Sequence, residues 1–174
     1  YDLELRTRPM PLDECLADLE RLRSENRHFE FFWFPHTETA FVKTMNRTDA
    51  ERTGEGGDFD STVENLAWEG LCRLSTAVPS TAPYATRLAA WSFSPDRAVG
   101  PSHEVFAHDR TVRFAESEWS VPADEVAPAI RELRSWIERH DEPVTFPVEV
   151  RYVAGDDIPL SPAYGRDSGF VAVH

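Results

Sequence analysis

Lysine is almost absent from this 174-residue chain: Lys43 is the only one, and arginine supplies the other basic residues. The 31 acidic residues outnumber the 18 basic ones, for a formal net charge of -13. Such a surface repels phosphate backbones and anionic lipid, so we expect no nucleic-acid partner and no membrane binding. The acid-rich, lysine-poor composition is typical of proteins that stay hydrated in strong salt, although a GC-rich genome gives the same arginine bias. A halophilic source is one of two interpretations.

Long apolar runs, cysteine clusters and metal-binding spacings are also missing. No apolar run approaches the ~20 residues that a membrane-spanning helix needs, so we expect no transmembrane segment. The six histidines show neither HxxxH nor HExxH spacing, and we expect no metal site. Cys15 and Cys72 each fall in a helical pattern, which favours buried free thiols, a reducing compartment and therefore a cytoplasmic protein. There is no GxSxG motif, and a triad of scattered Ser, His and Asp residues is left open.

What remains is the composition of one folded domain, with 41% hydrophobic and 28% charged residues. The chain starts at Tyr1 rather than Met, and GFVAVH at 169–174 resembles a strand with no polar tail. We therefore expect a piece of a longer polypeptide.

A duplicated pattern organises the chain. PLDE at 11–14 recurs as PADE at 122–125, and each proline followed by acids is typical of a helix N-terminus. Apolar residues at helical spacing follow both copies. One alternating, strand-like segment precedes each helix and two follow it. The segments are 2–8, 28–34 and 39–46 in the first copy, and 111–121, 147–153 and 168–174 in the second.

These patterns predict an α+β fold in which duplicated β-α-β-β units form one mixed, largely antiparallel sheet with helices on one face. The first repeat is 1–46, the second is 110–174, and 47–109 is a loop and helical insertion. The insertion should contain a helix over 61–78 and a short helix plus loop over 79–101. Glycines at 54, 56 and 57 suggest a phosphate cradle, but acids surround them and no Lys-Ser/Thr follows, so we reject that interpretation.

Glu149 and Arg151 are the candidate functional pair. In VEVRYV at 148–153 the apolar residues face the helices, which leaves these two on the open face, ~6.5–7 Å apart. An arginine stabilises developing negative charge, and a carboxylate accepts hydrogen bonds from hydroxyl groups, so the pair suits a small polar ligand. The alternative is a structural ion pair. Glu30 occupies the matching place in the first repeat. Glu116 and Glu118 share another strand face, as an acid–base pair or as solvated charges.

The segments EVR at 149–151, DD at 156–157 and LSPAYGRD at 160–167 resemble the C-terminal part of the sugar-1,4-lactone oxidase and alditol oxidase family. These are flavoproteins of the vanillyl-alcohol-oxidase type. HFEFFWFPHT at 28–37 and RFAESEWSVP at 113–122 resemble the same domain, so the resemblance spans nearly the whole chain.

The resemblance implies that residues 1–174 form the substrate (cap) domain of an FAD-dependent oxidoreductase. FAD would be bound mainly by an N-terminal domain of the same polypeptide, usually through a covalent histidine link. Glu149 and Arg151 match the family's catalytic, substrate-binding Glu-x-Arg pair, and His174 corresponds to a further substrate contact. The substrate would be a polyol or sugar lactone, oxidised by hydride transfer to flavin N5 with oxygen as the acceptor.

The chain departs from the family pattern because it lacks the C-terminal His-Trp-Gly-Lys motif. Its single lysine, Lys43, lies in the first repeat and does not correspond to the lysine of that motif. We therefore expect the FAD-binding domain and the extreme C-terminus to be missing, and the fragment alone to be inactive. Two alternatives stay open. One is a stand-alone module that binds a small polar ligand, and the other is a flavin dehydrogenase with a different acceptor.

Overall fold

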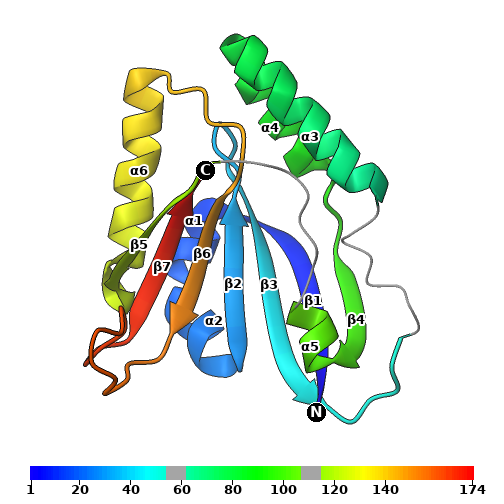
Figure 1. Cartoon of the computed structure of the whole chain (residues 1–174), viewed down its shortest axis with the longest axis vertical. Coiled ribbons are helices and arrows are strands. Elements are labelled where there is room, and N and C mark those ends of the chain that lie inside the picture. The colour runs from blue at the N-terminus through cyan, green and yellow to red at the C-terminus, as the bar shows by residue number, and fades with distance from the viewer. Residues whose placement is uncertain (54–61, 107–114) are drawn as a thin grey trace.

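The computed structural model describes residues 1–53, 62–106 and 115–174, and its centre is one seven-stranded sheet (Figure 1). The strand order is β4-β1-β3-β2-β6-β7-β5, and every pairing between these strands is antiparallel. The predicted α+β class is therefore confirmed. The strands are β1 (Asp2–Pro11), β2 (His28–Trp33), β3 (Thr39–Thr48), β4 (Asp96–Pro101), β5 (Ser117–Pro122), β6 (Val148–Val153) and β7 (Ser168–Val173).

The duplication is visible in the order of the strands. β1-β3-β2 and β5-β7-β6 have the same arrangement, in which the third strand of each unit lies between the first two. The two units meet where β2 pairs with β6, with Glu30 opposite Arg151 and Phe32 opposite Glu149. Glu30 and Glu149 thus take equivalent places on either side of this junction, and Arg151 takes the place that Phe32 has in the first unit.

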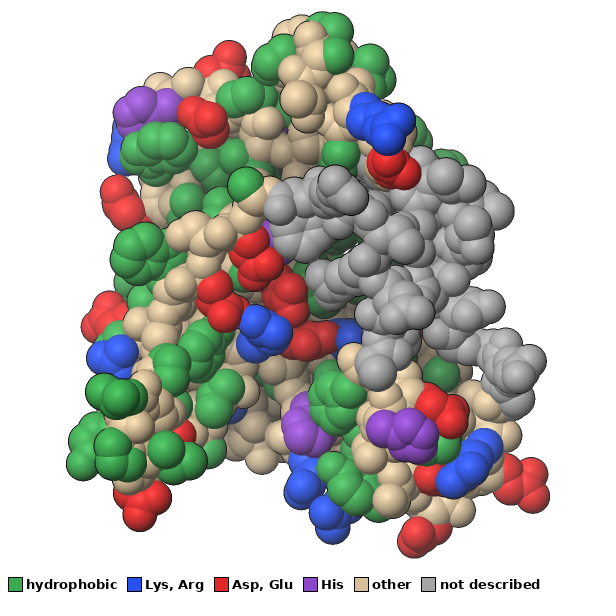
Figure 2. Space-filling view, in the orientation of Figure 1, with side chains coloured by type: hydrophobic (Ala, Val, Ile, Leu, Met, Phe, Trp, Pro, Cys, Tyr) green, Lys and Arg blue, Asp and Glu red, His purple; other side chains and the backbone are tan. Residues whose placement is uncertain are grey.

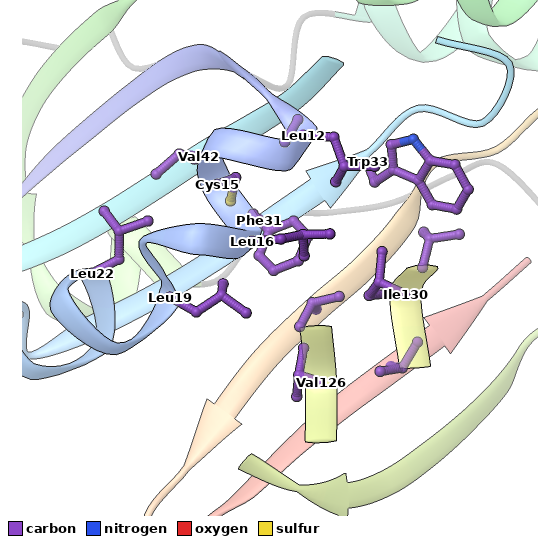
Figure 3. Packing of buried hydrophobic residues seen from close by; sticks show 14 of the residues in the cluster. Leu12, Cys15, Leu16, Leu19, Leu22, Phe31, Trp33, Val42, Val126 and Ile130 are labelled. Atoms are coloured by element: carbon purple, nitrogen blue, oxygen red, sulfur yellow. The ribbon is translucent and has the colours of Figure 1, made fainter. Parts of the chain in front are cut away.

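Helices cover one face of the sheet and enclose the main core (Figure 3). Strict alternation in β2 turns Phe29, Phe31 and Trp33 toward this face. Leucines of the first unit and Val126 and Ile130 of the second pack against them. The helices are α1 (Leu12–Ala17), α2 (Leu19–Glu25), α3 (Thr62–Ala77), α4 (Ala82–Ser92), α5 (Ser102–Phe106) and α6 (Val126–His140), with 3-10 turns at Pro79–Thr81 and Ala123–Glu125.

The first predicted helix is divided into α1 and α2. The break lies at Asp18, whose backbone (φ -106°, ψ 7°) leaves the helical region. Its carboxylate accepts a hydrogen bond from Arg21 (Nε to Oδ1, 2.8 Å), which stabilises the turn from the solvent side. The change of direction brings Leu19 and Leu22 onto the same core as Leu16.

The prediction of a short helix plus loop over 79–101 was wrong in one respect, because the insertion also contains a strand. The expected loop before Pro101 contains β4, an edge strand paired with β1 from Asp2 opposite Pro101 to Thr7 opposite Asp96. Proline and glycine at its end hid the strand pattern, but an edge position tolerates both residues. The glycines at 54, 56 and 57, on which a phosphate cradle was rejected, lie outside the described residues. Residues 111–114 of the expected strand 111–121 also lie outside the described residues, and the observed strand β5 begins at Ser117.

The insertion also covers both ends of the face that the repeats leave open. Val105 of α5 packs with Leu3, Leu5 and Met45 at one end, and alanines of α4 pack with Phe41 at the other. The middle of this face, over β2, β6 and β7, stays uncovered by the described helices (Figure 1). None of the helices in the described ranges combines the length and apolar character that a bilayer crossing requires.

Candidate functional site

Charged side chains gather in the middle of the open face (Figure 2). They come from strands that are distant in the sequence: Glu30 from β2, Lys43 from β3, Glu118 from β5, and Glu149 and Arg151 from β6. We call these five residues the charged cluster. They share one face because cross-strand partners in antiparallel pairs point the same way.

Arg151 is the centre of the cluster. Its guanidinium donates a hydrogen bond to the carboxylate of Glu118, and its Nε lies 3.7 Å from Oε1 of Glu149. Glu149 is buried, with 7% of its surface exposed, whereas the Arg151 side chain is 46% exposed. The two residues therefore share a face, as the strand alternation predicts. A role of the two residues in ligand binding, rather than as a structural ion pair, stays a prediction.

The electrostatics around Arg151 keep it charged. Partial burial lowers the pKa of its guanidinium, but the hydrogen bond to Glu118 and the charges of Glu149 and Glu30 more than offset this, and the pKa lies above its ordinary value. Arg151 therefore offers a permanent positive charge beside a cavity. The cavity measures about 290 Å³, at the small end of the ~300–1,000 Å³ range of ligand pockets. Glu30, Glu118, Phe106 and Phe170 line it together with Arg151.

Glu30 has a cation of its own. Lys43 lies opposite it on β3, with Nζ 2.7 Å from Oε1. Both side chains are mostly shielded, at 17% exposed for Lys43 and 15% for Glu30. The duplication relates Glu30 to Glu149, but no sequence pattern indicates a role for Lys43.

His174 lies at the edge of the cluster, and its side chain is only 2% exposed. Its Nδ1 is 3.0 Å from the carbonyl oxygen of Pro147, directly before β6, and its Nε2 is 3.9 Å from Oε2 of Glu116. The ring also packs against Phe146. These contacts anchor the start of the strand that carries Glu149, and a role as a substrate contact stays a prediction.

The sequence also left the role of Glu118 open. It was expected to be a solvated charge or half of an acid–base pair with Glu116. It instead pairs with Arg151, while Glu116 lies near His174. The contact depends on β7 lying between β5 and β6, an order that local sequence does not indicate. Within the described residues, no group of three or more His, Cys, Asp or Glu side chains is arranged to hold a metal ion.

Solved structures of the same fold include two cholesterol oxidases. The enzyme from Brevibacterium sterolicum, as a His-to-Ala mutant, superimposes with a TM-score of 0.63 at 16% identity, over 99% of this chain and 42% of the other. A solvent-stable cholesterol oxidase gives a TM-score of 0.66 at 13% identity, over the same shares of the two chains. At these identities the likeness shows the fold alone: the chain has the architecture of a domain found in oxidases.

The family follows from sequence. Residues 1–174 match the family described as D-arabinono-1,4-lactone oxidase, and the chain belongs to that family. It is 36% identical over 166 residues to L-gulono-1,4-lactone dehydrogenase of Mycobacterium tuberculosis, covering 94% of this chain and 39% of the relative. It is 31% identical over 177 residues to L-gulonolactone oxidase of Scyliorhinus torazame, covering 99% of this chain and 40% of the relative. The resemblance to sugar-lactone oxidases is confirmed, and the chain spans about two fifths of these relatives' length.

Proposed function

We propose that this chain is the substrate domain of an FAD-dependent oxidoreductase that oxidises a CH–OH group of an aldonolactone or alditol. The observation that carries the proposal is that a buried glutamate and a permanently charged arginine lie side by side on the open face, where the arginine lines a small cavity. Family membership supports the reaction class, and the names of the relatives, lactone oxidase and lactone dehydrogenase, support the substrate class.

The oxidation transfers a hydride from the carbinol carbon to the two-electron acceptor and releases the hydroxyl proton to the medium. Glu149 accepts the hydrogen bond of that hydroxyl and orients it, because a carboxylate shielded from water keeps its direction and its acceptor capacity. Arg151 stabilises the negative charge that develops on the oxygen as the proton leaves. Glu118 holds the guanidinium in place, so that little reorganisation is needed during the reaction.

The open face would lie against the flavin. When bound, FAD would supply the two-electron acceptor for the hydride. A flat ring that gains negative charge is best accommodated by a fixed cation with apolar side chains around it. Arg151 is that cation, and Phe170 and Phe32 lie on the same face in register with Arg151 and Glu149. These residues would contact the ring, while the rest of FAD would be held by a separate domain of the same polypeptide.

The charge of the cluster favours a neutral substrate. Glu30, Glu118 and Glu149 outnumber Lys43 and Arg151, within a chain whose net charge is -13. An anionic ligand would meet net repulsion there, whereas a lactone or alditol presents only hydroxyl and carbonyl groups. The neutral lactone should therefore be preferred over its ring-opened carboxylate.

The test is an anaerobic titration of the purified full-length protein that carries this chain. We expect a visible flavin absorption band that bleaches when an aldonolactone or alditol is added and responds far less to the ring-opened acid. A colourless, folded protein that binds polyols would favour the stand-alone binding module. Admitting air separates the acceptors. Rapid return of the band with peroxide formation supports oxygen, and return only with a quinone or cytochrome supports a dehydrogenase, the name borne by the Mycobacterium tuberculosis relative.

Two substitutions in the full-length protein assign the roles. Arg151→Ala should lower kcat by ~10²–10³, the scale for losing one preorganised charge partner in a transition state. Glu149→Gln should mainly raise KM, because the amide still fills the place but binds the hydroxyl more weakly. Near-normal turnover of the Arg151 variant, or unchanged kinetics of the Glu149 variant, would remove that residue from the proposed chemistry.

A further inference from the structure

We propose that Lys43 and Glu30 form a positioning pair, in which Lys43 holds the charge of Glu30 so that Arg151 stays available to the reacting groups. The inference rests on the proposed function and extends it to two residues that the Glu149/Arg151 pair does not include. Neither residue is assigned contact with the substrate.

The four residues Thr7, Lys43, Glu30 and Arg151 form one line across β1, β3, β2 and β6. Thr7 is opposite Lys43, Lys43 is opposite Glu30, and Glu30 is opposite Arg151. Glu30 therefore has a cation on either side, and the pair that forms is with Lys43, at 2.7 Å. On the other side of Lys43, the buried hydroxyl of Thr7 has no hydrogen-bond partner among the described residues. The ammonium group is thus directed to Glu30 rather than shared with β1.

The duplication explains why a second cation is needed. Glu30 on β2 and Glu149 on β6 are equivalent across the junction of the two units, so both carboxylates lie on the open face at the centre of the sheet. Arg151 is next to both of them, and it also carries the hydrogen bond to Glu118. The charge of Glu30 acts on Arg151 as well, since it contributes to the raised pKa of the guanidinium.

The consequence is competition among three carboxylates for one guanidinium. With Lys43 present, Glu30 is neutralised by its own partner, and only Glu118 and Glu149 engage Arg151. With Lys43 replaced by an apolar residue, the mostly shielded Glu30 carboxylate would lose its partner, and Arg151 is the cation in register with it. A shielded charge without a partner is strongly disfavoured, so Glu30 would turn to Arg151 and take up donors that otherwise face the cavity.

The experiment compares four variants of the full-length protein in steady-state assays with an aldonolactone. Lys43→Met should lower kcat roughly tenfold with a smaller change in KM, within the coupling observed between neighbouring charged side chains. Lys43→Arg keeps the charge and should retain most of the activity. The decisive variant is Lys43→Met/Glu30→Gln, which removes the competing carboxylate and should recover kcat to within about threefold of wild type.

Arg134→Met is the matched control. Arg134 is a similarly shielded cation (23% exposed) that pairs with Asp13 and Glu38, away from the charged cluster. It should leave kcat unchanged, which separates loss of the positioning pair from loss of a mostly shielded cation elsewhere in the domain. If Lys43→Met does not fold, Lys43→Gln, which removes the charge but can still hydrogen-bond Glu30, takes its place with a smaller expected loss of kcat that Glu30→Gln should again restore.

The outcomes are distinct. A wild-type protein without lactone-dependent flavin reduction overturns the proposed function and this inference with it. An active wild type with an unaffected Lys43→Met variant overturns the positioning role alone. A double variant as slow as the single one also overturns it, because a merely structural role of Lys43 is not restored by removing Glu30. Recovery in the double variant, together with a silent Arg134→Met control, supports the pair.

Discussion

Gly169→Ala should destabilise the domain through one contact, between β7 and the start of α6. A Cβ atom at this position would lie 2.1 Å from Cγ2 of Val126, the first residue of α6, more than 1 Å short of ordinary van der Waals contact. Val126 is fully buried, and its β-branched side chain has few rotamers with which to move aside. The first turn of α6 must therefore shift away from the sheet.

The expected cost follows from two opposing effects. Overpacking of a dense core costs ~1–3 kcal/mol, and replacing glycine by alanine within a strand returns ~0.5–1 kcal/mol of backbone entropy. We expect a net loss of about 1–2 kcal/mol in the free energy of unfolding. Val126→Ala alone should cost a similar amount, because it leaves a cavity where two methyl groups were.

The combined variant distinguishes a local clash from general disruption. In Gly169→Ala/Val126→Ala the new methyl group occupies part of the space that Val126 vacates, so the cost should fall below the sum of the single costs by about 1–3 kcal/mol. Urea unfolding of the 174-residue chain, followed by tryptophan fluorescence, measures all three variants. Strictly additive costs, or a neutral Gly169→Ala, would show that β7 and α6 are not in the close contact described.

Two further predictions concern burial and backbone contacts. Burial raises the pKa of the Cys15 thiol from its ordinary value of 9.0 to about 12. The unfolded chain therefore releases this proton first, and the stability from Cys15, present below pH ~9, is lost as the pH rises toward ~12. The difference in unfolding free energy between wild type and Cys15→Ala should shrink over that range, and a constant difference would contradict it. Gly155→Ala would place a Cβ 2.7 Å from the backbone of Arg166 and should lower Tm, whereas Gly70→Ala meets open space in α3 and should raise it slightly. Equal shifts in thermal unfolding would refute this.

The elements that were predicted well are those whose sequence shows alternation. β2 and β6 alternate between apolar and polar residues, and their predicted limits differ from the observed ones by a single residue. β4 was missed because its pattern is only a short apolar pair flanked by proline and glycine, and pairing with β1 rather than local preference makes it a strand. The break at Asp18 has the same origin, since packing of the following leucines on the sheet determines the direction of α2.

For the site, the limit of prediction was the separation between residues in the sequence. Glu149 and Arg151 are two positions apart on one strand, so their common face follows from strand geometry alone. Lys43 and Glu118 reach the same cluster only through the order β3-β2-β6-β7-β5, which cannot be obtained from local patterns. The duplication was the one usable signal: it related Glu30 to Glu149, and so pointed to the junction at which the cluster lies.

The cluster also shows how a duplicated fold becomes chemically one-sided. The two units place equivalent glutamates beside the β2–β6 junction, yet the positions next to them differ. Arg151 corresponds to Phe32, and Lys43 pairs with Glu30 from the place that Ala172 occupies opposite Glu149. In the first unit the glutamate is neutralised from the neighbouring strand β3, and in the second the cation lies on the same strand as the glutamate and faces the cavity. Because the backbone arrangement is common to both units, these few substitutions, and not the fold, concentrate the accessible positive charge in one half of the sheet.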